Sequence, residues 1–95
     1  MADPQAVQIQ ISLDETLAQG VYANLALIAS SEAEFTLDFI YLQPQQPKAT
    51  VRARVITSPQ HAKRLAQVLA EHLARYEARH GPISLPPVPS GLPPH

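Results

Sequence analysis

The sequence predicts an α+β fold, a four-stranded antiparallel sheet with one long C-terminal helix across one face. Four short segments alternate between two sets of side chains at the period of a β-strand. One long segment between Ser58-Pro59 and Gly81-Pro82 instead repeats its leucines at the period of an α-helix. We therefore expect a single domain over residues 6–81, a disordered N-terminus over 1–5 and a Pro-rich extended tail over 82–95.

The first predicted strand covers residues 7–13, in which apolar and polar side chains alternate strictly. One face carries Val7, Ile9, Ile11 and Leu13, and the other carries Gln8, Gln10 and Ser12. A strand with one wholly polar side suits the edge of a sheet, where that side meets water. Residues 14–20 interrupt the alternation and predict a turn or a short helical turn that ends at Gly20.

The next two predicted strands form a hairpin over residues 21–30 and 35–42. A short polar connection, Ser31-Glu32-Ala33, between two alternating segments is typical of such a hairpin. Two prolines then end the second strand, because proline removes a backbone donor and fixes φ. The loop 43–47 is expected to be exposed and mobile.

A fourth strand is predicted over residues 48–57. Its register against the hairpin follows from aligning apolar faces, because a slip of one residue would turn every core side chain outward. This alignment gives the pairs Phe39–Val51, Leu37–Ala53 and Asp38–Arg52. We therefore expect a cross-strand ion pair between Asp38 and Arg52.

The predicted helix begins at Pro59, where proline loses no hydrogen bond, with Ser58 as its capping residue. Gly81 followed by Pro82 ends it. The apolar stripe that we expect to pack across the sheet comprises Leu65, Leu69, Leu73 and Tyr76. A row of small residues that lets another backbone approach comprises Ala62, Ala66, Ala70, Ala74 and Ala78.

The tail after Gly81 is too rich in proline to continue the helix or to join the middle of a sheet. We expect extended, polyproline-like geometry. Two alternatives stay open, a tail free in solvent and a tail laid in a groove. The side chains that would dock in the second case are Ile83, Leu85, Val88 and Leu92.

The sheet face without the helix gives the main functional prediction. We expect the helix to cover Leu25, Leu27, Phe35, Leu37, Phe39 and Val51. The opposite face would then present Tyr22, Ile28, Ile40, Leu42 and Ile56 without cover. A contiguous apolar patch predicts a protein interface, and symmetric self-association is its commonest use. The alanines Ala66, Ala70 and Ala74 form a second candidate interface on the helix.

Composition limits the classes of function. The 95 residues include no cysteine, which excludes disulfides, thiolate zinc sites and a cysteine nucleophile. A chain of this length buries only about 60–65% of its unfolded surface, so oligomerisation is a natural source of stability. A net charge of −1 gives no bulk attraction to nucleic acid or anionic membranes. Without a signal-like N-terminus or an apolar run long enough to span a membrane, we expect a cytoplasmic protein.

No residue pattern predicts an enzyme, a metal site or a cofactor. The three glycines cannot form a phosphate loop or a dinucleotide fingerprint, and two of the histidines, His61 and His72, are about 16 Å apart along the helix. The alternative function is nucleic-acid association through a local basic patch of Arg52, Arg54, Lys63 and Arg64. This alternative is weaker because Asp38 would neutralise Arg52 and the surrounding face is apolar.

Two resemblances follow from these segments. The motifs AQGxYxN (18–24), EFxLDFI (34–40), PKA (47–49) and TPxHAKRL, in which Ser58 stands for Thr or Ser, resemble a small bacterial and archaeal family catalogued as a domain of unknown function. That resemblance implies a strand-rich domain with a terminal helix and no transferable activity. The order of elements and the LPPVP segment (85–89) are similar in layout to SecB-type export chaperones, which form tetramers and hold unfolded chains in apolar grooves.

We therefore expect a non-enzymatic protein whose first partner is itself, as a dimer or tetramer. Its second expected partner is an unfolded or peptide-like polypeptide segment, captured in the manner of a chaperone. We expect no cofactor and no membrane partner.

Overall fold

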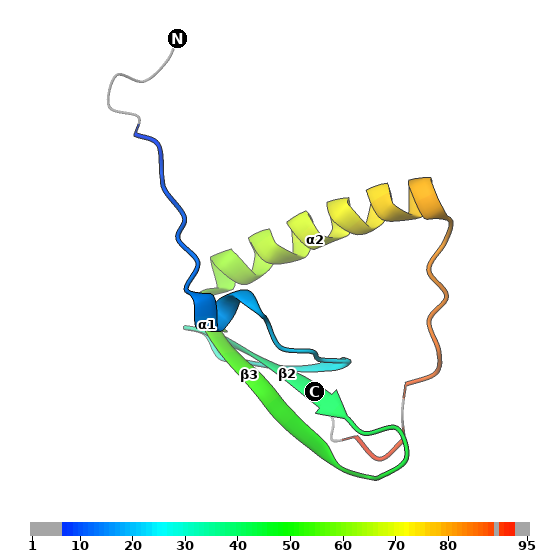
Figure 1. The fold of residues 1–95 in the computed structure, drawn as a ribbon. Helices are drawn as coiled ribbons and strands as arrows, with labels where there is room; N and C mark the ends of the chain where they lie inside the picture. The colour runs from blue at the N-terminus through cyan, green and yellow to red at the C-terminus, as the bar shows by residue number, and fades with distance from the viewer. Residues whose placement is uncertain (1–6, 89, 93–95) are drawn as a thin grey trace.

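The computed structural model describes residues 7–88 and 90–92. Its elements are α1 (Glu15–Ala18), β1 (Leu25–Ser30), β2 (Phe35–Leu42), β3 (Ala49–Thr57) and α2 (Pro59–His80) (Figure 1). This arrangement confirms an α+β fold with an antiparallel sheet and one long C-terminal helix. The helical turn expected within 14–20 is α1, which Asp14 caps by accepting from the Thr16 amide at 2.9 Å. The disorder predicted for residues 1–5 lies outside the described residues.

The sheet has three strands in the order β1-β2-β3, so the predicted fourth strand at 7–13 is wrong. Residues 7–13 have no regular secondary structure. Their four apolar side chains are between 68% and 93% exposed. The segment leads away from the sheet (Figure 1), and none of the described strands pairs with it. Alternation specifies the two sides of a strand, but it does not supply a neighbour to pair with.

The register between β2 and β3 is shifted by two residues from the prediction. Its central pairs are Leu37↔Val55, Asp38↔Arg54 and Phe39↔Ala53. One residue of the shift arises at the loop, because Leu42 pairs with Ala49. The other arises at a β-bulge: the consecutive residues Phe39 and Ile40 pair with Ala53 and Val51, which leaves Arg52 as the extra residue. The predicted Asp38–Arg52 ion pair is therefore wrong, and Arg54 takes the position of Arg52.

Pairing also fixes which side chains share a face of the sheet, because directly opposite residues point to the same side. Ile28, Leu37 and Val55 lie in one row across the three strands, on what we call the groove face. Leu27, Asp38 and Arg54 form a row on the other side, the ion-pair face. The predicted faces were therefore wrong in β1, where Leu25 and Leu27 share the face of Ile40. Val51 also joins Ile40 rather than Phe39, because of the bulge.

The hydrophobic core of this chain is small. Among the described residues only Leu37 on the groove face, at 9% exposure, and Ile40 on the ion-pair face, at 5%, are buried. The chain exposes 9007 Å², whereas a compact monomer of this mass exposes about 5,400 Å². The radius of gyration of 17.3 Å likewise exceeds the value of about 12 Å expected for a compact domain of this length.

Helix α2 begins and ends as predicted. The Ser58 hydroxyl accepts from the His61 amide at 3.1 Å, Pro59 occupies the first turn, and Gly81 ends the helix with φ 94°. The predicted packing across the sheet is wrong, however, because α2 starts at one end of the sheet and diverges from it (Figure 1). None of its residues is buried, and the stripe of Leu65, Leu69, Leu73 and Tyr76 is 43% to 54% exposed.

The side chain of Asn24 holds the start of β1 through two hydrogen bonds with the backbone of Leu42, one as donor and one as acceptor. Its amide Nδ2 donates to the Leu42 carbonyl at 3.0 Å, and the Leu42 amide donates to Asn24 Oδ1 at 2.8 Å. The Asn24 backbone amide donates to the Ile40 carbonyl at 3.0 Å. A side-chain amide thus imitates a strand residue and closes the ladder beyond the last β1 pair.

We predict that Asn24→Ala lowers the free energy of unfolding by about 1–2 kcal/mol, because two hydrogen bonds to one peptide group are lost. Urea unfolding at fixed protein concentration measures the change. Gln45→Ala is the matched control, since it removes an amide side chain from the exposed loop after β2. Equal stability of the two variants would contradict a structural role for the Asn24 side chain.

Candidate interaction surfaces

An apolar groove lies between the groove face of the sheet and the first turns of α2. It encloses about 540 Å³. The sheet contributes Ile28, Phe35 and Leu37, and the helix contributes Pro59, Ala62, Lys63, Leu65, Ala66 and Leu69. Lys63 is the one charged residue among these, and the other eight are apolar. We call this surface the helix–sheet groove.

The divergence of α2 creates this groove. A single residue, Ser58, separates the last residue of β3 from the first residue of α2. The helix therefore leaves the sheet at an angle (Figure 1). The residues of α2 that line the groove with Ile28, Phe35 and Leu37 all belong to its N-terminal half. A second apolar hollow of about 460 Å³ lies farther along α2, where Leu69, Leu73 and Tyr76 meet Ile83 of the tail.

The ion pair of the sheet lies on the ion-pair face, on the side opposite to the helix–sheet groove. Arg54 donates to both carboxylate oxygens of Asp38, from Nε at 2.7 Å and from Nη2 at 2.9 Å. Those hydrogen bonds hold the pKa of Asp38 below its ordinary value and raise the pKa of Arg54. This two-point contact neutralises the middle of the ion-pair face.

The predicted interface residues do not gather on one surface. Ile40, Leu42 and Ile56 share the ion-pair face, and Ile40 is already buried within the chain. Ile28 instead lines the helix–sheet groove. Tyr22 lies edge-on to Tyr41 with ring centroids 6.1 Å apart.

The predicted alanine interface is also divided. Ala66 lines the helix–sheet groove, whereas Ala70 and Ala74 are exposed residues of α2 outside its lining. Sequence reasoning therefore named two members of the groove, Ile28 and Ala66, without predicting the groove itself. The signal that could have found the groove is the single residue between β3 and α2.

The predicted basic patch is distributed over two elements. Arg52 occupies the β3 bulge, and Arg54 is engaged by Asp38. Lys63 and Arg64 lie on α2, where they border a polar hollow with Gln60, His61 and Gln67. The structure therefore does not present four free cations in one row.

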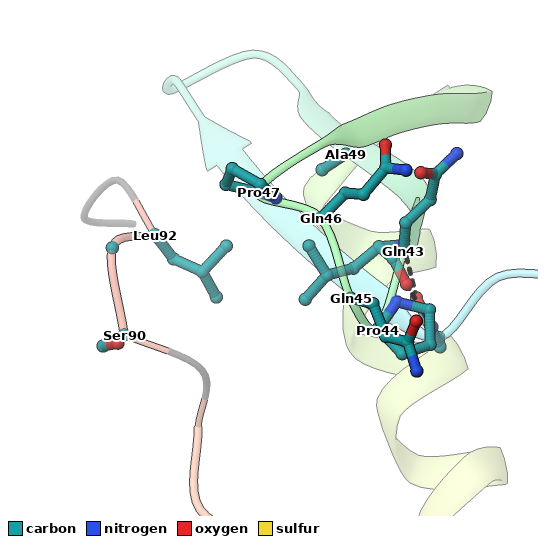
Figure 2. Close-up of a pocket in the computed structure, with 11 residues that line it drawn as sticks. Gln43, Pro44, Gln45, Gln46, Pro47, Ala49, Ser90 and Leu92 are labelled. Atoms are coloured by element: carbon teal, nitrogen blue, oxygen red, sulfur yellow. Dashed lines mark hydrogen bonds between the residues drawn. The ribbon is translucent and has the colours of Figure 1, made fainter.

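The tail returns to the loop between β2 and β3. The Ile83 amide donates to Glu77 Oε2 at 2.8 Å, while Leu85 and Val88 stay exposed. Residues 90–92 then border a hollow of about 820 Å³ whose other wall is the loop 43–47. Figure 2 shows the Leu92 side chain pointing from the tail toward this loop. Of the four side chains named for a docked tail, Ile83 and Leu92 therefore border hollows, and the two between them do not.

The described residues offer two further observations on chemistry. Within 7–88 and 90–92, no three histidine, aspartate or glutamate side chains converge as metal ligands would. Neither described helix combines the length and the apolar character that crossing a bilayer requires.

Comparison with known proteins identifies a family for this chain. A family model described as a protein of unknown function (DUF3467) matches residues 1–85. No curated protein and no solved structure matches the chain.

The Asp38–Arg54 pair predicts an acid-dependent loss of stability. A carboxylate whose pKa is lowered by folding stabilises the fold above its unfolded value of about 3.9 and loses that effect as pH decreases through the folded value. Asp38→Asn should therefore flatten the decline of stability below about pH 4. Unfolding midpoints measured against pH test this.

The matched variant is Arg54→Gln, which breaks the same ion pair by removing its cation. The double variant should show no more than the effect of either single variant, because both remove one interaction. An acid decline in Asp38→Asn as steep as in the wild type would contradict the prediction.

Proposed function

The chain belongs to the DUF3467 family of proteins of unknown function, and we propose that it is a non-enzymatic, homo-oligomeric protein that binds apolar polypeptide segments. The observation that carries this proposal is the helix–sheet groove, in which α2 presents leucine and alanine side chains to an apolar sheet face without closing on it. Such a surface in water is unfavourable unless another polypeptide covers it.

The exposed area supports self-association. The chain exposes roughly 3,600 Å² more than a compact monomer of its mass. A stable dimer interface buries about 1,200–2,000 Å² in total, and obligate interfaces bury more. The excess on each chain is therefore larger than the area that one such interface buries.

The helix–sheet groove suits an extended apolar segment better than a small polar ligand. Its lining offers aliphatic and aromatic side chains for burial and one cation, Lys63. Binding would draw on hydrophobic contact and would depend little on salt. The layout resemblance to SecB-type chaperones is an analogy for this mode of binding.

The alternative, nucleic-acid association, has less support. Of its four cations, Arg54 is paired with Asp38, and Arg52 lies at the β3 bulge on a different element from Lys63 and Arg64. The net charge is −1. Phosphate contacts would make affinity decrease steeply with ionic strength. Titration of a labelled oligonucleotide at two salt concentrations therefore separates the two functions.

The first prediction from this proposal concerns assembly. Light scattering coupled to size exclusion should give the mass of a dimer or tetramer at micromolar concentration, where a chain with this excess area associates. Dilution should shift the mass downward by mass action. A monomer at all accessible concentrations would overturn the proposal.

The second prediction concerns the helix–sheet groove. Ala66→Glu adds a charge to the apolar lining and should weaken binding of a fluorescent leucine- and phenylalanine-rich peptide by about tenfold or more, because the carboxylate must lose water there. Anisotropy titration measures the affinity. Gln67→Glu is the matched control, since it adds the same charge to the polar hollow beside Lys63 and Arg64. Equal affinities of the two variants would remove the groove as the binding site.

A further inference from the structure

Residues 7–13 have the alternating pattern of a strand, but none of the strands that the structure describes pairs with them. Their four apolar side chains alternate with polar ones and are among the most exposed in the protein. The segment leads away from its sheet (Figure 1). We propose that residues 7–13 add as a fourth strand to the free edge of β1 in a second copy of this chain, and that the second copy returns the same contact. This inference rests on the proposed self-association and specifies how it occurs.

The two free edges of the sheet differ in their protection against such pairing. β3 carries Arg52 and Arg54 and is interrupted by the bulge, and charged side chains and bulges are the usual defences of an edge strand. β1, with the sequence LALIAS, carries no charge, no proline and no bulge between Leu25 and Ser30. The unprotected edge is therefore β1. The six residues of β1 are close in number to the residues of the segment 7–13.

The two sides of the segment match the two faces of the sheet. The row Ile28–Leu37–Val55 on the groove face is apolar in all three strands, and Ile9 or Ile11 would continue it. On the other side, Gln8 and Gln10 would extend the face that holds the ion pair. This alignment keeps apolar side chains together along the groove face of a fourth strand, and it places the glutamines beside Leu25 and Leu27 on the other face.

Reciprocal exchange gives a closed two-fold dimer, because the same segment and the same edge are used twice. Main-chain hydrogen bonds supply the attraction in this kind of strand addition, and side chains on the apolar face select the register. The added strand would also widen the apolar floor beneath α2 and bury part of the area that one chain leaves exposed.

Gln10→Pro in the full chain tests the exchange. Proline removes a backbone donor and disfavours the centre of a sheet, yet Gln10 is exposed in the isolated chain. The dimer dissociation constant, measured by sedimentation, should increase by about tenfold or more. Gln10→Thr is the matched control and should leave it unchanged, because threonine suits a strand.

Cross-linking locates the contact. Because the chain has no cysteine, a tagged Gln10→Cys chain can be mixed with an untagged Ala29→Cys chain and joined by a short bis-maleimide. A covalent heterodimer should form with Ala29→Cys and should not form with His80→Cys at the far end of α2.

The outcomes separate this inference from the proposed function. A wild-type monomer overturns both. A wild-type oligomer that Gln10→Pro leaves intact overturns the exchange alone. A Gln10→Pro variant that loses unfolding stability but keeps its dissociation constant also overturns it, because the segment would then pair within its own chain.

Discussion

Ser58 alone separates β3 from α2, and the rest of the structure depends on that connection. The serine caps the helix and Pro59 fixes its first turn. The local backbone geometry, rather than the packing of side chains against the sheet, therefore sets the direction of α2. With no loop to turn it back, the helix diverges and leaves its leucines exposed. The small core and the open groove both follow from this geometry. The helix itself tolerates exposure, because α2 is rich in alanine, leucine and arginine, which favour helix without tertiary support.

Four residues of the motifs quoted from the sequence have structural roles. Gly20 takes φ 71° after α1, Asn24 closes the β1–β2 ladder, and Asp38 pairs with Arg54 across β2 and β3. Ser58 then sets the angle of the helix. None of these four roles requires a bound substrate. These residues therefore explain the shape of the chain, and contact with a partner is the role proposed for the apolar surfaces.

Local signals in the sequence predicted the helix, its caps, the hairpin and the strand after it, because each depends on neighbouring residues. Signals that depend on distant residues were missed. The bulge at Arg52 and the pairing of Leu42 with Ala49 each shift the register by one residue, so Arg54 and not Arg52 faces Asp38. No local sequence pattern predicts either shift. The pattern of residues 7–13 likewise defined a strand without defining its neighbour. The groove was foreseen only through its members Ile28 and Ala66, since its existence depends on the angle of α2.

The small core and the self-association proposed above would together have a consequence for the life of the protein in a cell. When a chain buries much of its apolar surface only by contact with a second copy, its folded fraction depends on the concentration of the chain. Newly made chains at low abundance would expose α2 and the β1 edge for longer, and proteases act on such open states. Expression level would then set turnover: scarce chains would be degraded, and only abundant ones would accumulate.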